Sequence, residues 1–331
     1  MRSLTLLWAL ACASAPADSG DAIDTADTGD TGATVIDTAD TGDTGDTADA
    51  GGATLLSVGD GHNCVLRGDG TAACWGDDAA AQSSAPAGAW STLEAGLWQT
   101  CALDGAGAIT CWGCENEWVL GQCEAPAGAY TQVVAGSYHG CALDAAGAIT
   151  CWGCGDRDFG QCEAPAGAYA SIAAGTVHTC ALDPAGAATC WGCQEVNSGE
   201  CDAPSTPFVA LTLGSAHSCG LDASGGVTCW GRDTFGESSP PPGPYQSVAA
   251  GQTSTCAVQA ESGAVACWGC EANGSPDIDL GQCLAPAVTG ARAVGSGTGH
   301  SCALLADGTV TCWGCGDDWD FDRGQCESWA D

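Results

Sequence analysis

The sequence predicts an all-β protein, a disulfide-rich β-propeller of seven short antiparallel blades, and three observations predict it. A repeat unit returns seven times from residue 53 onward, with its first cysteine spaced by 37, 40, 39, 39, 37 and 46 residues. Each unit holds short segments in which apolar and polar residues alternate, as they do in half-buried strands. Cysteines stand at matching places in all units. Small sheets that recur at such a period protect their edges by closing into a ring.

The repeat unit is clearest between residues 135 and 153. His139, Cys141 and Leu143 fall on one face of a first strand, a turn rich in Ala, Asp and Gly follows, and a second strand ends at Trp152. A further strand comes later, as at residues 130–136. The Cys-Trp-Gly triplet of the second strand recurs with its tryptophan at Trp75, Trp112, Trp152, Trp191, Trp230, Trp268 and Trp313.

The ends of the repeat region predict how the ring closes. The last repeat ends soon after Gly324-Gln325-Cys326 and lacks the strand that follows the other repeats. An additional strand, residues 54–59, precedes the first repeat. We therefore expect this N-terminal strand to complete the last blade, so that residues 53–331 form one closed propeller.

The cysteines predict two sets of disulfides. All seven repeats have a first pair, ten or eleven residues apart across a hairpin, where two side chains can face each other. Five repeats have a second pair after the Cys-Trp-Gly triplet. The first pairs are Cys64 with Cys74, Cys101 with Cys111, Cys141 with Cys151, Cys180 with Cys190, Cys219 with Cys229, Cys256 with Cys267 and Cys302 with Cys312. The second pairs are Cys114 with Cys123, Cys154 with Cys162, Cys193 with Cys201, Cys270 with Cys283 and Cys315 with Cys326.

The two repeats without a second pair favour disulfides over a metal. Both cysteines of the pair are missing together there, which is expected of disulfide partners. Zinc is the alternative, because Cys111 and Cys114 form a Cys-x-x-Cys motif, but two repeats would then keep half a site. The hydrophobic fraction of 45% is inflated by alanine and cysteine, so disulfides replace a large aliphatic core. We expect reduction to unfold the propeller.

The N-terminus predicts export. Residues 1–11 combine Arg2 with a short apolar run, as in a signal peptide, and the run is too short to span a bilayer. Residues 9–12 resemble the cleavage box of bacterial lipoproteins, so we expect Cys12 to be lipidated. Ordinary cleavage after Ala13 or Ala15 is the alternative. Cys12 is also the odd cysteine among 25, which a lipid anchor or removal explains.

Residues 12–52 predict a tether. Aspartate recurs there at every third position with one phase slip, and threonine, glycine and alanine lie between. Ten negative charges without a cation or a large side chain cannot collapse, so we expect a disordered Asp/Thr/Gly segment. The aspartate spacing of an EF-hand is absent from it.

The net charge excludes several classes of partner. The chain has 41 acidic residues against six arginines and no lysine, a net charge of −35. Nucleic-acid binders need cations to contact phosphates, and binding to an anionic membrane by charge needs them too. The cysteine content argues against a reduced cytosol. We expect an outer-membrane or cell-surface lipoprotein, or a secreted protein, that contacts a membrane only through its lipid anchor.

The repeats resemble a known family. The pattern Ala-Gly-x-x-His-x-Cys-Ala-Leu, then Gly-x-x-x-Cys-Trp-Gly and Gly-Gln-Cys, is similar to the regulator-of-chromosome-condensation repeat in a short bacterial exported form. The resemblance covers residues 53–331 and implies a seven-bladed propeller. The family's usual Gly-Gln-Leu-Gly is Gly-Gln-Cys here in most repeats. The eukaryotic namesake exchanges nucleotide on a small GTPase and contacts chromatin, and neither activity is expected of an exported chain this acidic.

Residues that break the repeat are candidates for ligand binding. Trp98 takes a position that is small or variable elsewhere, and Trp118, Trp319 and Phe321 lie in variable loops after Cys-Trp-Gly. Aromatic side chains among acids suit the docking of a basic protein or a sugar, and a merely solvated acidic rim is the alternative. The acids of these loops are Glu115, Glu117, Asp156, Asp158, Asp277, Asp279, Asp317, Asp318, Asp320 and Asp322. Calcium held by Asp317, Asp318, Asp320 and Asp322 is a further hypothesis.

Two recurring side chains are expected to be structural. Every histidine stands two residues before the first cysteine of its repeat, and Gln99 and Ser254 take that place in the other two repeats. A side chain at one repeated position is expected to make the same internal hydrogen bond in each blade. The Cys-Trp-Gly tryptophans are expected to pack between blades. The histidines are His62, His139, His178, His217 and His300.

The sequence favours binding over catalysis. It contains no phosphate loop, no nucleophile elbow and no histidine paired with a distinctive serine or free cysteine, so we expect neither an enzyme nor a cofactor. The leading hypothesis is a monomeric, non-catalytic cell-surface protein that presents acidic and aromatic loops to a protein partner. A lectin-like propeller that binds a glycan, and a passive surface or structural lipoprotein, are the alternatives.

Overall fold

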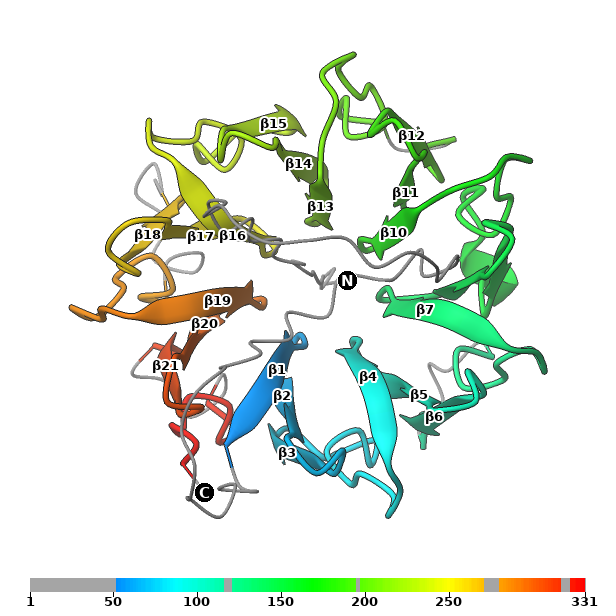
Figure 1. Ribbon diagram of the computed structural model, residues 1–331, viewed down its shortest axis with the longest axis horizontal. Coiled ribbons are helices and arrows are strands. Elements are labelled where there is room, and N and C mark those ends of the chain that lie inside the picture. Colours follow the sequence, from blue (N-terminus) through cyan, green and yellow to red (C-terminus); the bar gives the residue numbers. More distant parts are fainter. Residues whose placement is uncertain (1–51, 116–120, 195–196, 271–279, 317–321, 331) are drawn as a thin grey trace, which may run out of the picture.

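The protein is the seven-bladed propeller that the repeats predict (Figure 1). The computed structural model describes residues 52–115, 121–194, 197–270, 280–316 and 322–330. Within them, seven sheets of three antiparallel strands stand around a central axis, and each sheet is built from strands consecutive in sequence. These sheets are blades 1 to 7 in chain order. In the described part of the chain, no helix is long and apolar enough to cross a membrane.

Each blade has an inner, a middle and an outer strand. The inner strands are β1 (Ala53–Val58), β4 (Trp90–Ala95), β7 (Tyr130–Ala135), β10 (Ser171–Ala174), β13 (Ala210–Leu213), β16 (Tyr245–Ala250) and β19 (Ala291–Ser296), and they lie nearest the axis in Figure 1. The middle strands are β2 (His62–Arg67), β5 (Gln99–Asp104), β8 (Gly140–Asp144), β11 (Thr179–Leu182), β14 (His217–Leu221), β17 (Thr255–Gln259) and β20 (His300–Leu305). The outer strands are β3 (Ala72–Gly76), β6 (Ile109–Gly113), β9 (Ile149–Trp152), β12 (Ala188–Trp191), β15 (Val227–Gly231), β18 (Val265–Trp268) and β21 (Val310–Gly314). A single 3-10 turn, η1 (Gly155–Arg157), follows β9.

The Ala-Asp-Gly turns join the middle strands to the outer strands. In blade 2 a carboxylate oxygen of Asp104 accepts hydrogen bonds from the amides of Ala106 and Ala108, at 2.8 and 2.9 Å. Gly107 follows with φ of 81°, a conformation that glycine adopts without strain. The turn thereby sets a register in which Cys101 lies directly opposite Cys111.

Twelve disulfides join the same cysteine pairs that the sequence predicts. Seven of them link a middle strand to an outer strand, with 4.0 Å between the two Cα atoms, and the other five close the loops that follow the outer strands. The strand disulfides join Cys64 to Cys74, Cys101 to Cys111, Cys141 to Cys151, Cys180 to Cys190, Cys219 to Cys229, Cys256 to Cys267 and Cys302 to Cys312. The loop disulfides join Cys114 to Cys123, Cys154 to Cys162, Cys193 to Cys201, Cys270 to Cys283 and Cys315 to Cys326.

Where the loop disulfide is missing, in blades 1 and 5, a hydrogen bond stands in its place. Ser83 Oγ donates to the carbonyl oxygen of Asp77 at 2.8 Å in blade 1. Ser238 Oγ donates to that of Arg232 at 2.7 Å in blade 5. The loop therefore keeps its closure in both blades, although the covalent bond is absent.

The apolar core is divided among the seams, the spaces between neighbouring blades. One hydrophobic cluster fills each of the seven seams. In the seam between blades 7 and 1, Val58 and Val65 pack with Leu304 and Val310. The blades are therefore held together by burial between them, and the ring has to close for every cluster to be complete.

The predicted closure by the N-terminal strand is wrong. Residues 54–59 do not complete the last blade, because β1 pairs with β2 in blade 1 and β19 already fills the inner position of blade 7. Only three residues, 59–61, separate β1 from β2, so pairing forward along the chain costs little loop entropy. Every inner strand begins a blade in the same way.

The ring closes through the hydrophobic cluster between blades 7 and 1, and residues 322–330, here named the clasp, add further contacts across this seam. The Trp329 amide and carbonyl form two hydrogen bonds with Val310 of blade 7, at 3.0 and 2.9 Å. Its indole stacks on Trp75 of blade 1, with ring centroids 6.5 Å apart. The side-chain amide of Asn63, in blade 1, donates a hydrogen bond to the backbone carbonyl of Gln325 at 2.7 Å. The disulfide between Cys326 and Cys315 links the clasp to the end of blade 7.

Trp329 supplies an aromatic ring that blade 1 lacks. In blades 2, 5 and 6 the aromatic residue that begins or shortly precedes the inner strand packs on the Cys-Trp-Gly tryptophan of a seam, as Trp90 packs on Trp112 with centroids 6.1 Å apart. The residue that begins the inner strand of blade 1 is Ala53. The clasp therefore completes blade 1 from the other end of the repeat region.

The two sets of disulfides are expected to differ in their contribution to stability. Replacing the loop pair by the residues of blade 1, Cys154→Asp with Cys162→Ser, should lower the free energy of unfolding by about 2–3 kcal/mol. Replacing the hairpin pair, Cys141→Ser with Cys151→Ser, should cost more, because Cys141 is fully buried in a seam. Urea denaturation under oxidising conditions measures both losses. Equal losses, or an unchanged midpoint for the wild-type protein in reductant, would contradict this account.

Removal of the clasp tryptophan is expected to weaken the ring at one seam. Trp329→Ala should lower the free energy of unfolding by about 2–4 kcal/mol, because it removes a partly buried indole and its stacking on Trp75. Ser328→Ala, at the exposed neighbouring position, is the matched control and should change it by less than about 0.5 kcal/mol. Urea denaturation compares the two variants, and equal stabilities would show that the clasp does not stabilise this seam.

Candidate functional site

One face of the propeller carries the seven turns between inner and middle strands, and it is named the turn face. The segments that follow the outer strands begin on this face, because their first amides donate to carbonyl oxygens of the turns. These hydrogen bonds run from Asp77 to Gly61, Cys114 to Trp98, Arg232 to Ala216 and Cys315 to Gly299, at 2.7–2.9 Å. The variable loops that the sequence singles out are therefore anchored beside the turns.

Of the four aromatic residues predicted to bind a ligand, the structure describes Trp98. It lies in the turn of blade 2, it is partly exposed, and it meets the ring of Tyr138 from blade 3 edge to face, with centroids 6.4 Å apart. Trp118, Trp319 and Phe321 lie outside the described residues. The structure thus places one predicted binding residue on the turn face.

Sequence reasoning missed the residues that accompany Trp98. Leu97 and Tyr138 are 4% and 6% exposed, and they pack with Trp98 and Val177 in a small cluster of turn residues. The four residues belong to blades 2, 3 and 4 and are named the turn cluster. The turns of the other blades place Asp60-Gly61, Ser215-Ala216, Gln252-Thr253 and Thr298-Gly299 at the matching positions. A comparison of these two positions across the repeats would have revealed the cluster.

The predicted acids are described in part. Glu115, Asp158 and Asp322 are exposed. Glu117, Asp277, Asp279, Asp317, Asp318 and Asp320 lie outside the described residues, as does the Asp156 side chain. Three of the four aspartates of the calcium hypothesis belong to this group. Within the described ranges, no three His, Cys, Asp or Glu side chains gather in a way that would hold a metal ion.

Each of the five described arginines contacts another group of the protein, although Arg157 and Arg323 are themselves exposed. Three of them lie over aromatic rings, and three contact an acid or a backbone carbonyl, because Arg232 does both. Arg67 lies over Trp329 and Arg157 over Tyr138, at 5.6 and 4.7 Å from the ring centroids, Arg232 pairs with the buried Glu237 at 2.6 Å, Arg292 donates to Ala53 O, and Arg323 pairs with Asp77. Few cations are therefore left to balance the negative charge of the exposed acidic side chains.

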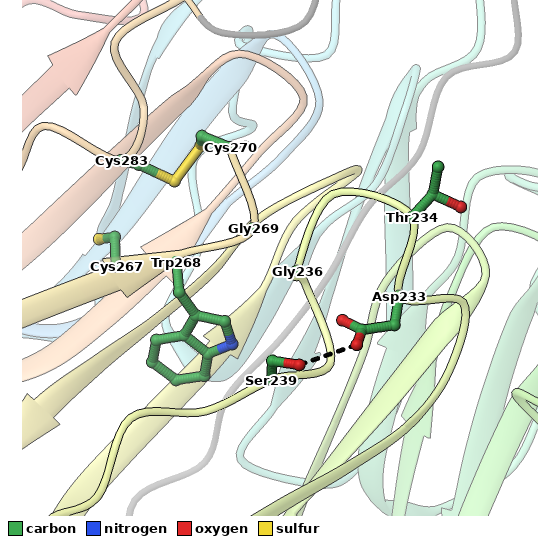
Figure 2. A pocket seen from close by; sticks show the side chains of 9 residues that line it. All are labelled: Asp233, Thr234, Gly236, Ser239, Cys267, Trp268, Gly269, Cys270 and Cys283. Carbon is green, nitrogen blue, oxygen red and sulfur yellow. Dashed lines mark hydrogen bonds between the residues drawn. A yellow bond between two sulfur atoms is a disulfide. The ribbon is translucent and has the colours of Figure 1, made fainter. Parts of the chain in front are cut away.

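A hollow of about 720 Å³ opens between the loop of blade 5 and blade 6 (Figure 2). Its lining includes Asp233, Ser239 and the Cys270–Cys283 disulfide. The carboxylate of Asp233 accepts hydrogen bonds from the Ser238 amide and the Ser239 hydroxyl, at 2.9 and 2.8 Å. These groups hold the shape of a loop that lacks its disulfide, so we assign no ligand to the hollow.

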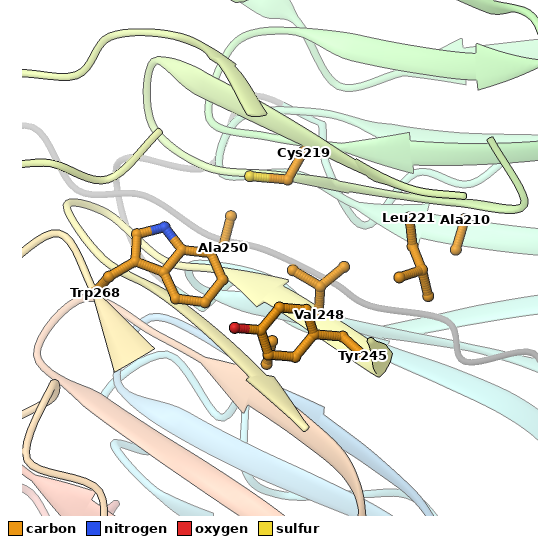
Figure 3. Packing of buried hydrophobic residues seen from close by; sticks show 8 residues of the cluster. Ala210, Cys219, Leu221, Tyr245, Val248, Ala250 and Trp268 are labelled. Carbon is orange, nitrogen blue, oxygen red and sulfur yellow. The ribbon is translucent and has the colours of Figure 1, made fainter. Parts of the chain in front are cut away.

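The Cys-Trp-Gly tryptophans pack in the seams, as the sequence predicts. Figure 3 shows the seam between blades 5 and 6, where Trp268 lies with Tyr245 and Val248 against Leu221. The indole Nε1 of Trp268 donates to the Glu237 carbonyl at 3.0 Å. Trp112, Trp152, Trp191, Trp230 and Trp313 make the same bond to the matching loop residue, at 2.8–3.0 Å.

The histidines bind the next blade and are structural, as the sequence predicts. His62 Nε2 lies 2.9 Å from Thr100 Oγ1 of blade 2, and this hydroxyl donates onward to the Gln82 carbonyl at 3.0 Å. Since the hydroxyl hydrogen is used there, we assign the hydrogen of the neutral ring to Nε2. The other four histidines contact Thr179, Ser218, Thr255 and Asn63 of the following blade at 2.7–3.0 Å. In blade 2 the Gln99 amide instead donates to the Gly136 carbonyl at 2.7 Å.

Burial keeps all five histidines neutral. Loss of hydration lowers the pKa of His62 and His139 to about 4, and that of His178, His217 and His300 to about 3. A second proton would enter at Nδ1, which is buried and makes no hydrogen bond within the described residues. Burial acts in the opposite direction on Glu94 of β4, a carboxyl that is 2% exposed and whose pKa is raised well above its usual value.

Comparison with known proteins identifies the kind of repeat. Residues 130–161, 208–237 and 291–318 match the profile of the regulator of chromosome condensation (RCC1) repeat. Each match begins at or shortly before the inner strand of a blade and ends in the loop after its outer strand. Together with the seven blades, these matches define the class of protein as a repeat propeller. Three of its seven repeats match the RCC1 repeat, and the chain is in this respect similar to RCC1-repeat propellers. No curated protein sequence matches it significantly.

Solved structures with a similar fold include receptor ectodomains. The entire ectodomain of the receptor kinase CR4 from Physcomitrella patens is 26% identical, with a TM-score of 0.63 over 80% of this chain and 74% of that one. The CRINKLY WD40 ectodomain of the Arabidopsis thaliana receptor kinase ACR4 is 22% identical, with a TM-score of 0.58 over 80% and 97%. Prp20p of Saccharomyces cerevisiae is 18% identical, with a TM-score of 0.56 over 73% and 80%. The twelve disulfides of this chain indicate an extracellular protein, because disulfides form and persist in oxidising compartments.

The buried histidines predict a loss of stability in mild acid. Unfolded histidines bind a proton near pH 6.5 and the folded ones only near pH 3–4, so the unfolded state holds more protons between these values. Below pH 6.5 each buried histidine therefore lowers the free energy of unfolding by about 1.4 kcal/mol for each pH unit of acidification. Glu94 has the opposite effect, because its raised pKa lets the folded state bind a proton that the unfolded state does not. His139→Gln introduces the residue that blade 2 has at this position, Gln99. It should reduce the slope of the free energy of unfolding against pH by the contribution of one proton. Urea denaturation between pH 7 and about 4.5 measures it, and an unchanged slope would contradict the assignment.

Proposed function

We propose that this protein is a non-catalytic binding protein at the cell surface, whose turn face docks a protein partner with a basic surface. The observation that carries the proposal is the distribution of charge. The chain has 41 acidic residues against six arginines, and each of the five described arginines already contacts a ring, an acid or a carbonyl, although Arg157 and Arg323 are exposed. Glu115, Asp158 and Asp322 are exposed in the loops that follow the outer strands. Complementary charge increases the rate of association and selects the partner.

The scaffold supports this function. Short strands and disulfides hold the turns and loops on a rigid ring, and binding residues carried on loops of a rigid framework are common. The similar structures agree with such a role, because two are receptor ectodomains and Prp20p binds Gsp1p and histones. We assign none of these partners to the present chain.

The location at the surface rests on the N-terminal residues. We propose that residues 1–11 are a lipoprotein-type signal peptide, that Cys12 is lipidated, and that residues 12–52 tether the propeller of residues 53–331 to the membrane. The protein then belongs to the outer membrane or cell surface and acts as a monomer. Residues 1–51 lie outside the described part of the chain.

Binding to a basic protein is tested with the oxidised protein, immobilised and exposed to a cell-surface extract of its source organism. A saturable protein that is released between low and high salt is the expected result, since exposed charges are screened by ions. Glu115→Gln with Asp158→Asn should weaken its capture at low salt, and Val209→Ala, at an exposed apolar position, should not.

Two other outcomes would overturn the proposal in favour of the alternatives. Capture of a glycan that is lost with EDTA would make the protein a lectin-like propeller. The absence of any bound molecule at high loading would favour a passive surface or structural lipoprotein.

A further inference from the structure

The turn cluster is separate from the packing that builds the propeller. Seven hydrophobic clusters fill the seven seams, and the turn cluster of Leu97, Trp98, Tyr138 and Val177 is an eighth, formed by turn residues of blades 2, 3 and 4. The turns of the other four blades fold with small or polar side chains at the same positions. The fold of a turn therefore does not require these side chains.

The turn cluster already holds one guanidinium group. The Arg157 side chain extends from η1 and lies 4.7 Å from the centroid of the Tyr138 ring. The faces of aromatic rings attract cations, and arginine combines this attraction with planar stacking. Trp98 is the partly exposed aromatic residue of the cluster, and indole is the strongest of the side chains that bind cations in this way.

Exposed acids flank the aromatic pair. The amide of Cys114 donates to the Trp98 carbonyl at 2.9 Å, and the next residue along the chain is the exposed Glu115. Asp158 is exposed, directly follows Arg157 in the loop beside Tyr138, and accepts the Gly160 amide at 2.9 Å through one carboxylate oxygen. The loops next to the aromatic pair thus carry two exposed acids and one exposed arginine, whose guanidinium already lies over Tyr138.

We propose that the turn cluster docks an arginine-bearing segment of the basic partner, with a guanidinium group stacked on Trp98 and its charge balanced by Glu115 and Asp158. This inference rests on the proposed function, because it names the chemistry by which the turn face recognises a basic protein. Lysine satisfies the carboxylates but not the stacking, so the site prefers arginine over lysine at equal charge.

The test compares two labelled peptides of equal length and charge, one rich in arginine and one rich in lysine, by fluorescence anisotropy with the oxidised full chain at low salt. The arginine peptide should bind about three- to fivefold more tightly. Trp98→Ala should remove this preference by weakening the arginine peptide more than the lysine peptide, whereas Trp98→Phe should keep most of the preference. Glu115→Gln should weaken both peptides equally.

The outcomes separate the inference from the function on which it rests. Equal binding of the two peptides to the wild-type protein, or an arginine preference that survives Trp98→Ala, would overturn the stacking site and leave the acidic docking face in place. Failure of both peptides to bind at low salt would contradict the docking face as well. The urea midpoint of Trp98→Ala, compared with wild type, shows whether a lost preference arises from the site or from unfolding.

Discussion

One backbone carbonyl in each seam organises the propeller. In the seam between blades 1 and 2, the Gln82 carbonyl accepts hydrogen bonds from the Thr100 hydroxyl and the Trp112 indole, both at 3.0 Å. Thr100 in turn contacts His62, and the Gln82 side chain accepts the amide of Ala80 at 2.7 Å, which holds the carbonyl in place. Buried polar groups are costly unless they are paired, so this network explains why histidine, hydroxyl, tryptophan and glutamine recur together.

Local contacts explain which parts of the fold were predictable. The blades and the disulfides follow from residues about ten positions apart, such as Cys64 and Cys74, whose spacing is visible in every repeat. The structural role of the histidines was also predictable, but their partners were not, because Thr100 lies 38 residues from His62 in the next blade. The clasp was missed for the same reason: Asn63 and Gln325 are 262 residues apart, and Asn63 stands where most other repeats have threonine or serine.

The candidate site was predictable only where one repeat differs from the others. Trp98 stands out because a bulky ring replaces a small or variable side chain, and this deviation made it a binding candidate; the structure places it, partly exposed, on the turn face. Tyr138 and Val177 are modest deviations when each repeat is read alone, and they become a cluster only when blades 2, 3 and 4 lie side by side. The acidic surface was visible in the composition, but the internal use of the arginines required coordinates, because each pairs across a loop or a seam.

The clasp imposes an order on folding. Each blade pairs its own consecutive strands, and six of the seven seams join blades that are neighbours in the chain, so an arc of blades can assemble progressively as the polypeptide is synthesised. The seventh seam joins segments from opposite ends of the repeats and has the highest contact order in the molecule. Until blade 7 has emerged, blade 1 presents an uncovered apolar edge, and until residue 329 has emerged, Trp75 lacks its stacking partner. A chain stalled at that stage is therefore the species most in need of chaperones.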